Sequence, residues 1–269
     1  MPGLLTAGLL AALCLLVPAA ASAQLEIRLG GFGDTTQGDQ VIPDLDGFEA
    51  LAGDLGQVMG PKMLGPAETT GALGFDIGLE FSFSNIDETS SHWQRALSES
   101  RSMLTTAQLQ VRKGLPYSFE VGGVVSHLFD TDLWGVGMSL KWAMLEGYKV
   151  VPDVALRGSV STVLGSRDMS MLIGGGDITV SKSFGVGGVL SLGPYIGYSA
   201  LFVRASSFVL GVFPDDSPRP IKFVIPGQNI LRHRGFIGFR LVSVHAAVAF
   251  EAMIAEGIQT FTTTIGADF

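Results

Sequence analysis

The sequence predicts an all-β fold, an antiparallel transmembrane β-barrel of about ten strands with a short N-terminal helical segment. Three observations lead to this prediction. Apolar and polar residues alternate with a period of two over most of the chain after Gly71. Several of these runs reach the roughly 9 to 11 residues that a tilted transmembrane strand needs. The chain also begins with an apolar stretch of the kind that directs export. Eight or twelve strands remain compatible with the pattern.

The composition excludes two classes of protein. Charged residues make up 16% of the chain and apolar residues 47%, so there is ample apolar material to bury and intrinsic disorder is excluded. The formal net charge is -8. A nucleic-acid-binding protein needs a basic surface, and no run of Lys and Arg supplies one.

Residues 1–23 are expected to form a signal peptide. No charged side chain occurs from Gly3 to Ala23, and the stretch ends in Ala21-Ser22-Ala23 after Pro18. An uncleaved membrane anchor is the alternative, because about 20 apolar residues can cross a bilayer. Cleavage after Ala23 would remove Cys14, the single cysteine, and with it any disulfide, thiolate metal site or Cys nucleophile.

Residues 24–70 differ in composition from the rest and are expected to form a periplasmic or plug segment. Within it, residues 44–59 have the spacing of an amphipathic helix, with Asp44 as N-cap and Gly60-Pro61 as the stop. The helix could fill the lumen, pack beneath the barrel at its periplasmic mouth, or touch the inner leaflet. Leu25, Ile27 and Leu29 could add one short strand.

Residues 71–269 are expected to form the barrel. In the run LGFDIGLEFSF, Leu73, Phe75 and Ile77 share one strand face while Asp76 and Glu80 share the other. The other runs with this alternation are Met103–Val111, Tyr117–Val125, Trp134–Met144, Val154–Leu164, Leu172–Phe184, Leu190–Phe202, Phe236–Phe250 and Gln259–Phe269.

These nine runs pose a problem of parity. If the first strand runs outward, the outer connections are Asn85–Ser102, Asp130–Asp132, Gly165–Ser170 and Ala205–His233. The inner ones are Lys113–Pro116, Glu146–Pro152, Gly185–Gly188 and Ala252–Glu256. Bacterial barrels have an even number of strands, so a tenth is expected. We place it within Leu201–Phe213, with Pro214-Asp215-Asp216 as its turn.

The last strand carries a more specific signal. Phe261, Ile265, Ala267 and Phe269 share one face, and Thr260, Thr262, Thr264 and Asp268 share the other. Here the sequence resembles Gram-negative outer-membrane β-barrel proteins, whose last strand alternates in this way and ends in an aromatic residue. The resemblance implies an outer-membrane location after signal-peptide cleavage. It also implies recognition of Phe261, Ile265 and Phe269 by the barrel-assembly machinery, and contact with membrane lipid and lipopolysaccharide.

A row of polar side chains is expected to face the lumen. Cross-strand ion pairs within this row are geometrically reasonable. Because side chains largely fill a barrel of this size, we interpret the row as a structural polar core rather than a selectivity filter. Its members are Asp76, Glu80, Gln108, Gln110, Arg112, Glu120, Lys141, Arg157, Asp177 and Arg240.

No enzymatic constellation is predicted. Ser126-His127 is the best candidate for a hydrolase, but adjacent strand residues point to opposite faces, so an interfacial role for His127 is favoured. Arg232-His233-Arg234 could meet lipopolysaccharide phosphates. His245 shares a polar face with Ser243 and Glu251. No spacing predicts a catalytic site, a metal site or a cofactor.

The sequence therefore favours a non-enzymatic, porin-like outer-membrane barrel that passes small solutes passively, the solute being unknown. The main alternative is a structural or surface-interaction barrel with a filled lumen that acts through its extracellular loops. A membrane-embedded hydrolase at His127 is a weaker hypothesis. A soluble barrel around an apolar ligand would reverse the faces and place Leu73, Phe75 and Ile77 inside.

Overall fold

The computed structural model describes residues 25–36, 40–62, 65–148, 150–212 and 221–269. The expected signal peptide, residues 1–23, lies outside this part of the chain. So does the expected turn at Pro214-Asp215-Asp216.

Ten antiparallel strands form a closed barrel, which confirms the predicted fold class and strand number. Each strand pairs with its neighbour in the chain, and the last pairs with the first, so that Phe261 lies opposite Phe83. The ten strands are β3 (Phe75–Asn85), β4 (Met103–Leu115), β5 (Phe119–Leu128), β6 (Trp134–Leu145), β7 (Asp153–Leu164), β8 (Met169–Ser181), β10 (Leu190–Ser207), β13 (Gln228–Ser243), β14 (Ala246–Ala255) and β15 (Ile258–Asp268).

The tenth strand does not come from the predicted place. Leu201 lies within β10, which runs on to Ser207, and the predicted crossing over Leu201–Phe213 is therefore wrong. The run Phe236–Phe250 is instead divided into β13 and β14 by a turn at Val244, whose φ is 56°. No Gly, Pro or Asn marks this turn, so the usual residues that predict a turn are missing there.

The two ends of the barrel differ in their connections. The long-loop end carries the connections 86–102, 129–133, 165–168, 208–227 and 256–257. The short-turn end carries 116–118, 146–152, 182–189 and 244–245, together with Phe269. The connection at Ala252–Glu256 therefore belongs to the long-loop end, which corrects its predicted position on the inner side. The short strand β9 (Phe184–Val186) extends β10 at the short-turn end.

The barrel is apolar outside and polar inside. Along β3, Phe75, Ile77 and Phe83 are exposed on the outer surface while Asp76 and Glu80 are buried. This is the arrangement of a transmembrane barrel. The soluble barrel with reversed faces, which required Phe75 and Ile77 inside, is contradicted.

The aromatic residues do not all lie on the outer surface. Trp134, Trp142 and Tyr198 are exposed there, as expected of residues at a membrane interface. Tyr195 points inward and packs with Phe236 and Met253, because it has the opposite parity along its strand.

The N-terminal segment forms the predicted helix, α2 (Leu45–Met59). Asp44 caps it by accepting a 3.0 Å hydrogen bond from the Gly47 amide, and Gly60 ends it. Before the helix come the 3-10 turn η1 (Gly30–Phe32) and the ribbon of β1 (Gly33–Thr36) and β2 (Gln40–Pro43). The expected strand at Leu25–Leu29 amounts to a single bridge between Ile27 and Leu97. No helix in the described part of the chain is long and apolar enough to cross a membrane.

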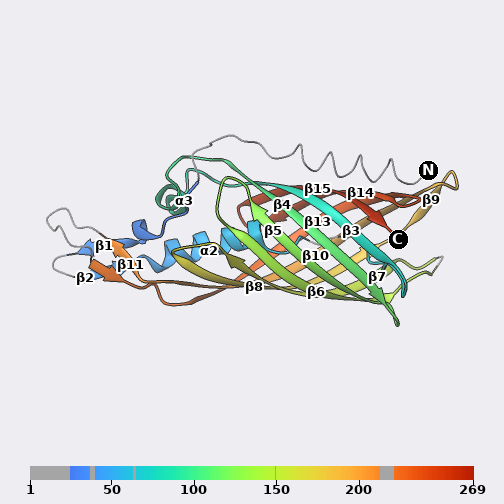
Figure 1. The fold of residues 1–269 in the computed structure, drawn as a ribbon, viewed down its shortest axis with the longest axis horizontal. Helices are drawn as coiled ribbons and strands as arrows, with labels where there is room; N and C mark the ends of the chain where they lie inside the picture. Colours follow the sequence, from blue (N-terminus) through green and yellow to red (C-terminus); the bar gives the residue numbers. More distant parts are fainter. Residues whose placement is uncertain (1–24, 37–39, 63–64, 149, 213–220) are drawn as a thin grey trace, which may run out of the picture.

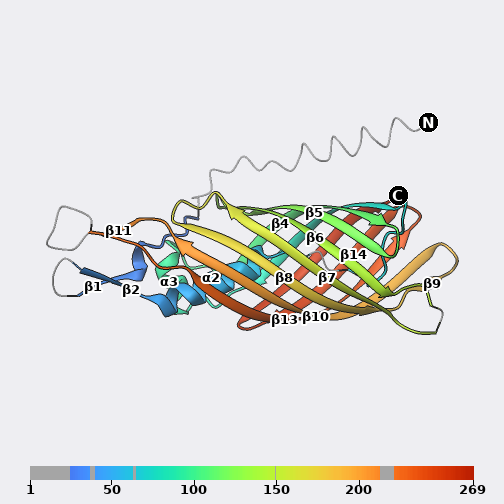
Figure 2. The same cartoon turned by 90° about the horizontal axis from the view of Figure 1, so that it is seen from below.

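Helix α2 lies in the long-loop end of the barrel, opposite the C-terminus (Figure 1). Beyond it, β1 and β2 lie beside a second ribbon of β11 (Leu210–Val212) and β12 (Ile221–Phe223), which belongs to the connection 208–227 (Figure 2). The short helix α3 (Ser91–Ala96) covers α2 from the connection 86–102. The N-terminal segment is thus a plug at the long-loop end and does not pack at the opposite mouth.

Candidate functional site

The long-loop half of the lumen is filled by an apolar core. Phe48, Leu51, Leu55 and Val58 project from α2 and are fully buried. They pack in one cluster with inward residues of the barrel wall and with Trp93 of α3. The wall residues of this cluster include Leu104, Leu128, Val163, Met171, Ile173, Leu201, Val203, Ala205 and Ile230. The main hydrophobic core of the protein is therefore a helix packed inside a barrel mouth.

Glycines on one side of α2 allow this close fit. Gly53, Gly56 and Gly60 follow the spacing of one helix face, and they lie against the wall formed by β10 and β13. A methyl group added at Gly56 would collide with Val203, and one at Gly53 would come within 2.5 Å of the Arg232 guanidinium. The helix face is thus shaped to this part of the wall.

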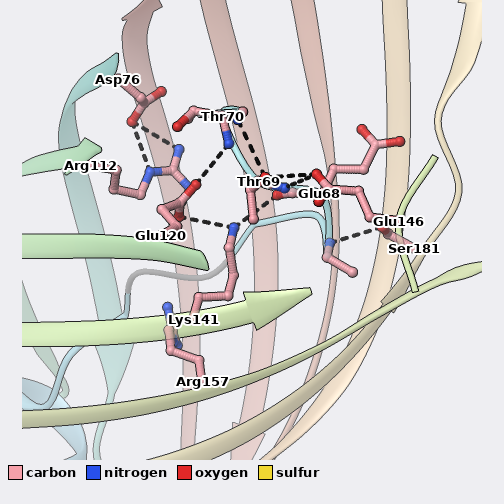
Figure 3. A network of polar contacts seen from close by, with 12 residues as sticks. Glu68, Thr69, Thr70, Asp76, Arg112, Glu120, Lys141, Glu146, Arg157 and Ser181 are labelled. Atoms are coloured by element: carbon pink, nitrogen blue, oxygen red, sulfur yellow. Dashed lines mark hydrogen bonds and ion pairs between the residues drawn. The ribbon is translucent and has the colours of Figure 1, made fainter. Parts of the chain in front are cut away.

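The short-turn half of the lumen is filled by ion pairs (Figure 3). Arg112 on β4 pairs with Asp76 on β3 at 2.9 Å. Lys141 on β6 pairs with Glu120 on β5 at 3.0 Å, and the second contact of Glu120, to Arg112, is 4.0 Å long. These groups are buried, so each charge depends on its partner and on further hydrogen bonds for the solvation that water would otherwise supply.

Three further groups of polar side chains line the lumen. Arg157 pairs with Asp177 at 2.6 Å, and Arg234 approaches the other Asp177 oxygen at 3.9 Å. Arg240 pairs with both Asp76 and Asp268, the latter at 2.7 Å. In the middle of the barrel, the Tyr195 hydroxyl donates a 3.0 Å hydrogen bond to Glu251.

The chain between α2 and β3 runs through this polar half and is bound to it. The Thr70 amide donates to Glu120 at 3.0 Å, and the Ala67 amide donates to the Ser181 hydroxyl at 2.9 Å. Lys141 donates to the Glu68 carbonyl at 2.9 Å. The backbone amide and hydroxyl of Thr69 both donate to Glu146. Figure 3 shows these contacts converging on the segment from several strands.

The ten predicted lumen residues all lie on the inner face of the barrel, and nine of them are buried, with Arg240 partly exposed. The prediction missed several equivalent residues, which are Lys62, Arg234, Glu251 and Asp268. Arg234 has the same parity as Arg240 on β13 and was missed because the outer connection was expected to extend to His233. Glu251 on β14 follows from strand parity once the turn at Val244 is known. Lys62, which contacts Thr106 and the Val58 carbonyl, had no signal because its segment has no period of two.

Two hollows within the lumen bear on the passage of solutes. A cavity bounded by Asp76, Gln110 and Arg112 measures about 10 Å³, which is room for a single water molecule at most. A larger hollow of about 380 Å³ opens at the short-turn mouth beside Glu68 and Arg240. A hollow of about 940 Å³ is lined mostly by apolar residues, among them the outward Phe83, Ile196 and Phe239, and the inward Tyr195 and Glu251 also line it.

At the long-loop end, the described parts of the N-terminal segment and of the loops form one folded unit, which we call the cap (residues 25–36, 40–62, 86–102, 129–133, 165–168, 208–212 and 221–227). The Leu25 amide donates to the Asp130 carbonyl, and the Leu29 amide donates to the Asp168 carboxylate at 2.9 Å. Arg95 of α3 pairs with Asp44 at 2.6 Å.

Polar contacts also join α2 to α3 inside the cap. The Trp93 indole donates to Asp54 at 3.0 Å, and His92 contacts the same carboxylate at 2.9 Å. In the loop before α3, hydrogen bonds from the Thr89 and Ser90 side chains lower the pKa of Asp87. The cap is therefore held by ion pairs and hydrogen bonds in addition to its apolar core.

The histidines form no catalytic group in the structure. Ser126 is buried in the lumen, while His127 points outward and stacks on Trp134 with 4.4 Å between ring centroids. His245 lies in the turn after β13, beside Phe269, and not on one face with Glu251. No cluster of three metal-ligating side chains occurs among the described residues.

The basic cluster Arg232-His233-Arg234 is also divided between the faces. Arg232 and Arg234 point into the lumen and only His233 is exposed, where it contacts Tyr198. The predicted patch for lipopolysaccharide phosphates therefore does not form.

Neither the protein-family models nor the curated proteins gave a match to this chain. Solved structures with a similar fold include the KdgM porin in complex with disordered oligogalacturonate, at 9% identity and a TM-score of 0.36, over 72% of this chain and 99% of that one. Ail, the attachment invasion locus protein of Yersinia pestis, matches at 11% identity and a TM-score of 0.27, over 74% and 99%. The beta domain of the Bordetella autotransporter BrkA matches at 10% identity and a TM-score of 0.42, over 73% and 100%. The likeness lies in the outer-membrane barrel fold alone.

Proposed function

We propose that this protein is a non-conducting outer-membrane barrel that presents its cap at the cell surface as an interaction surface. The observation that supports this function is the path of residues 45–74. Helix α2 fills one half of the lumen, and the segment that follows is bound within the other half.

The orientation follows from the two ends of the barrel. Bacterial barrels have short turns on the periplasmic side and longer loops outside. We therefore assign the long-loop end, with the cap, to the cell surface and the short-turn end, with Phe269, to the periplasm. Phe261, Ile265 and Phe269 are exposed on the lipid-facing side of β15, where the barrel-assembly machinery could contact them during insertion.

Passive passage of small solutes is the competing function. It requires a continuous water path along the inward charged row. In the described chain, seven of those charged side chains pair with one another, Glu80 accepts a hydrogen bond from Ser82, and a cavity beside Asp76, Gln110 and Arg112 measures about 10 Å³. Solutes could cross only if the segment left the lumen.

The geometry also supports a non-enzymatic role. A serine nucleophile needs a base within hydrogen-bond reach. Ser126 and His127, the best candidate pair, lie on opposite faces of β5, with His127 bound to the Leu133 carbonyl.

Planar-bilayer conductance tests the proposal. The refolded mature protein is expected to insert without current steps, whereas a variant lacking residues 25–70 should show discrete steps whose size increases with salt concentration. A variant shortened in the β9 hairpin, which lies outside the lumen, is the control and should stay silent. Heat-dependent gel mobility reports whether each variant has formed a barrel.

Salt-dependent steps from the complete mature protein would contradict the proposal. If Asp76→Asn then changed the ion selectivity of those steps, the lumen row would be a conduction path and passive passage would be the function.

A further inference from the structure

We infer that the barrel carries its own N-terminal segment through its lumen to the cell surface, and would carry an unfolded polypeptide attached ahead of Leu25 in the same way. This inference rests on the orientation given in the proposed function, but it does not require the cap to bind a partner.

The path of the chain is the first argument. The barrel begins and ends at the short-turn end, where the Phe75 amide donates to the Phe269 carbonyl at 2.9 Å and the Phe269 amide donates back at 2.8 Å. From Phe75 the preceding chain runs through the lumen to the opposite end, where Leu25 is bound to the connection 129–133. Figure 2 shows α2, β1 and β2 at that end and the C-terminus at the other. Residues 25–36 and 40–44 therefore lie on the opposite side of the membrane from Phe75 and Phe269, the first and last residues of the barrel.

The charged residues of the N-terminal segment favour a path through the lumen over a path through the lipid. The segment contains Asp44, Asp46, Glu49 and Asp54, and carboxylates are costly to move through hydrocarbon. The short-turn half of the lumen offers polar side chains instead, among them Gln110, Arg112 and Glu120. This half lies between the periplasm and the apolar seat of α2, so a polar chain entering from the periplasm meets hydrogen-bonding groups first.

The size of the lumen limits what can pass. Its long-loop half holds one helix, with the backbone of Gly56 against Val203 and that of Gly53 against Arg232. A helix with side chains is about 10–12 Å across. A single extended or helical segment of polypeptide fits this width, and a folded domain does not. A disulfide-closed loop has to pass as two strands side by side, about 5 Å apart, so it needs about twice the width of a single extended chain.

Single-cysteine labelling of intact cells tests the inference. In a Cys14→Ser background, Glu26→Cys places a thiol on the N-terminal segment, Ser98→Cys on the connection 86–102, and Val150→Cys on the connection 146–152. All three native side chains are exposed. A membrane-impermeant maleimide should label positions 26 and 98 in intact cells, and position 150 only after the outer membrane is permeabilised.

Labelling of position 26 only after permeabilisation, in cells where position 98 reacts, would overturn the inference. These are point substitutions at exposed sites, so barrel formation is expected to be retained and heat-dependent mobility verifies it. Conductance of the complete protein would refute the proposed function while leaving this result unchanged, so the two failures are distinguishable.

A second experiment tests the limit on size. An epitope-tagged peptide with two cysteines, inserted directly before Leu25, is oxidised to a loop in the periplasm, and its matched control has both cysteines replaced by serine. The serine form should be labelled by antibody on intact cells, and the disulfide form at least tenfold less. Equal surface labelling of the two forms would show that the segment does not pass through the lumen.

Discussion

The two halves of the lumen hold the same segment in opposite ways. At the long-loop end, the helix is held by close packing, with its apolar side chains buried and its glycines against the barrel wall. At the short-turn end, the segment after the helix is held by charged and polar side chains of the wall, which form hydrogen bonds with its backbone. Packing in the first half tolerates little change in volume, whereas the network in the second half tolerates little change in charge.

This difference suggests separate tasks for the two halves. An apolar seat keeps water out of the outer mouth and fixes the cap on the barrel. A polar seat keeps the approach to that mouth hydrated while the chain enters, and then closes around the backbone. Substitutions that act on one half alone can test this division.

The largest effect is expected from a change of shape at the helix. Gly56→Leu adds a side chain where a methyl group would already collide with Val203, so α2 cannot keep its place. We expect the silent barrel to become conducting, with discrete current steps in planar bilayers and unchanged heat-dependent mobility.

Gly158→Leu is the matched control, because a methyl group there would meet nothing within 4 Å. It should leave the barrel silent. A Gly56→Leu barrel that folds and stays silent would mean that the helix does not depend on this close fit.

A change of charge in the other half should lower stability without opening the lumen. Glu120→Gln removes the charge that pairs with Lys141 at 3.0 Å, and leaves a buried ammonium without its partner. Breaking a buried pair from one side costs about 3–5 kcal/mol. We expect a loss of this size in the free energy of unfolding in urea, measured in lipid vesicles, with no current steps.

An exposed ion pair supplies the comparison. Glu26 pairs with Arg28 at 2.6 Å while both side chains are at least half exposed, and Glu26→Gln should cost at most about 1 kcal/mol. If Glu120→Gln cost no more than this control, the network around Glu120 would not hold the segment.

The sequence allowed the barrel and its inward row to be predicted because one rule covers both. A strand of period two fixes which side chains share a face, and the row from Asp76 to Arg240 followed from it. The rule failed at Val244, where a tight turn without Gly, Pro or Asn interrupted the pattern and shifted the parity of β14. Glu251 was missed for that reason.

The helix could be predicted, but its place could not. Asp44, the apolar spacing and Gly60 define α2 locally. Its position in the lumen depends on contacts between residues far apart in the chain, such as Gly56 with Val203 and Ala67 with Ser181. Such contacts leave no periodic signal in a single sequence.

The smallest effect is expected at Asp44, the N-cap of α2, where the long-loop half also uses a charge and a hydrogen bond. Asp44 accepts a hydrogen bond from the Gly47 amide at 3.0 Å and pairs with Arg95 at 2.6 Å. Asp44→Ala removes both and should lower the free energy of unfolding by about 1 kcal/mol, the usual value of an N-cap. Asp44→Asn can keep the N-cap hydrogen bond and removes only the charge. Urea unfolding of the two variants therefore separates the contribution of the hydrogen bond from that of the ion pair. Stability near that of the unchanged protein for Asp44→Asn is expected, because the Arg95 pair is partly exposed to solvent. A loss as large as that of Asp44→Ala would mean that charge holds the long-loop half as well, and the contrast between the two halves would then lie in their packing alone.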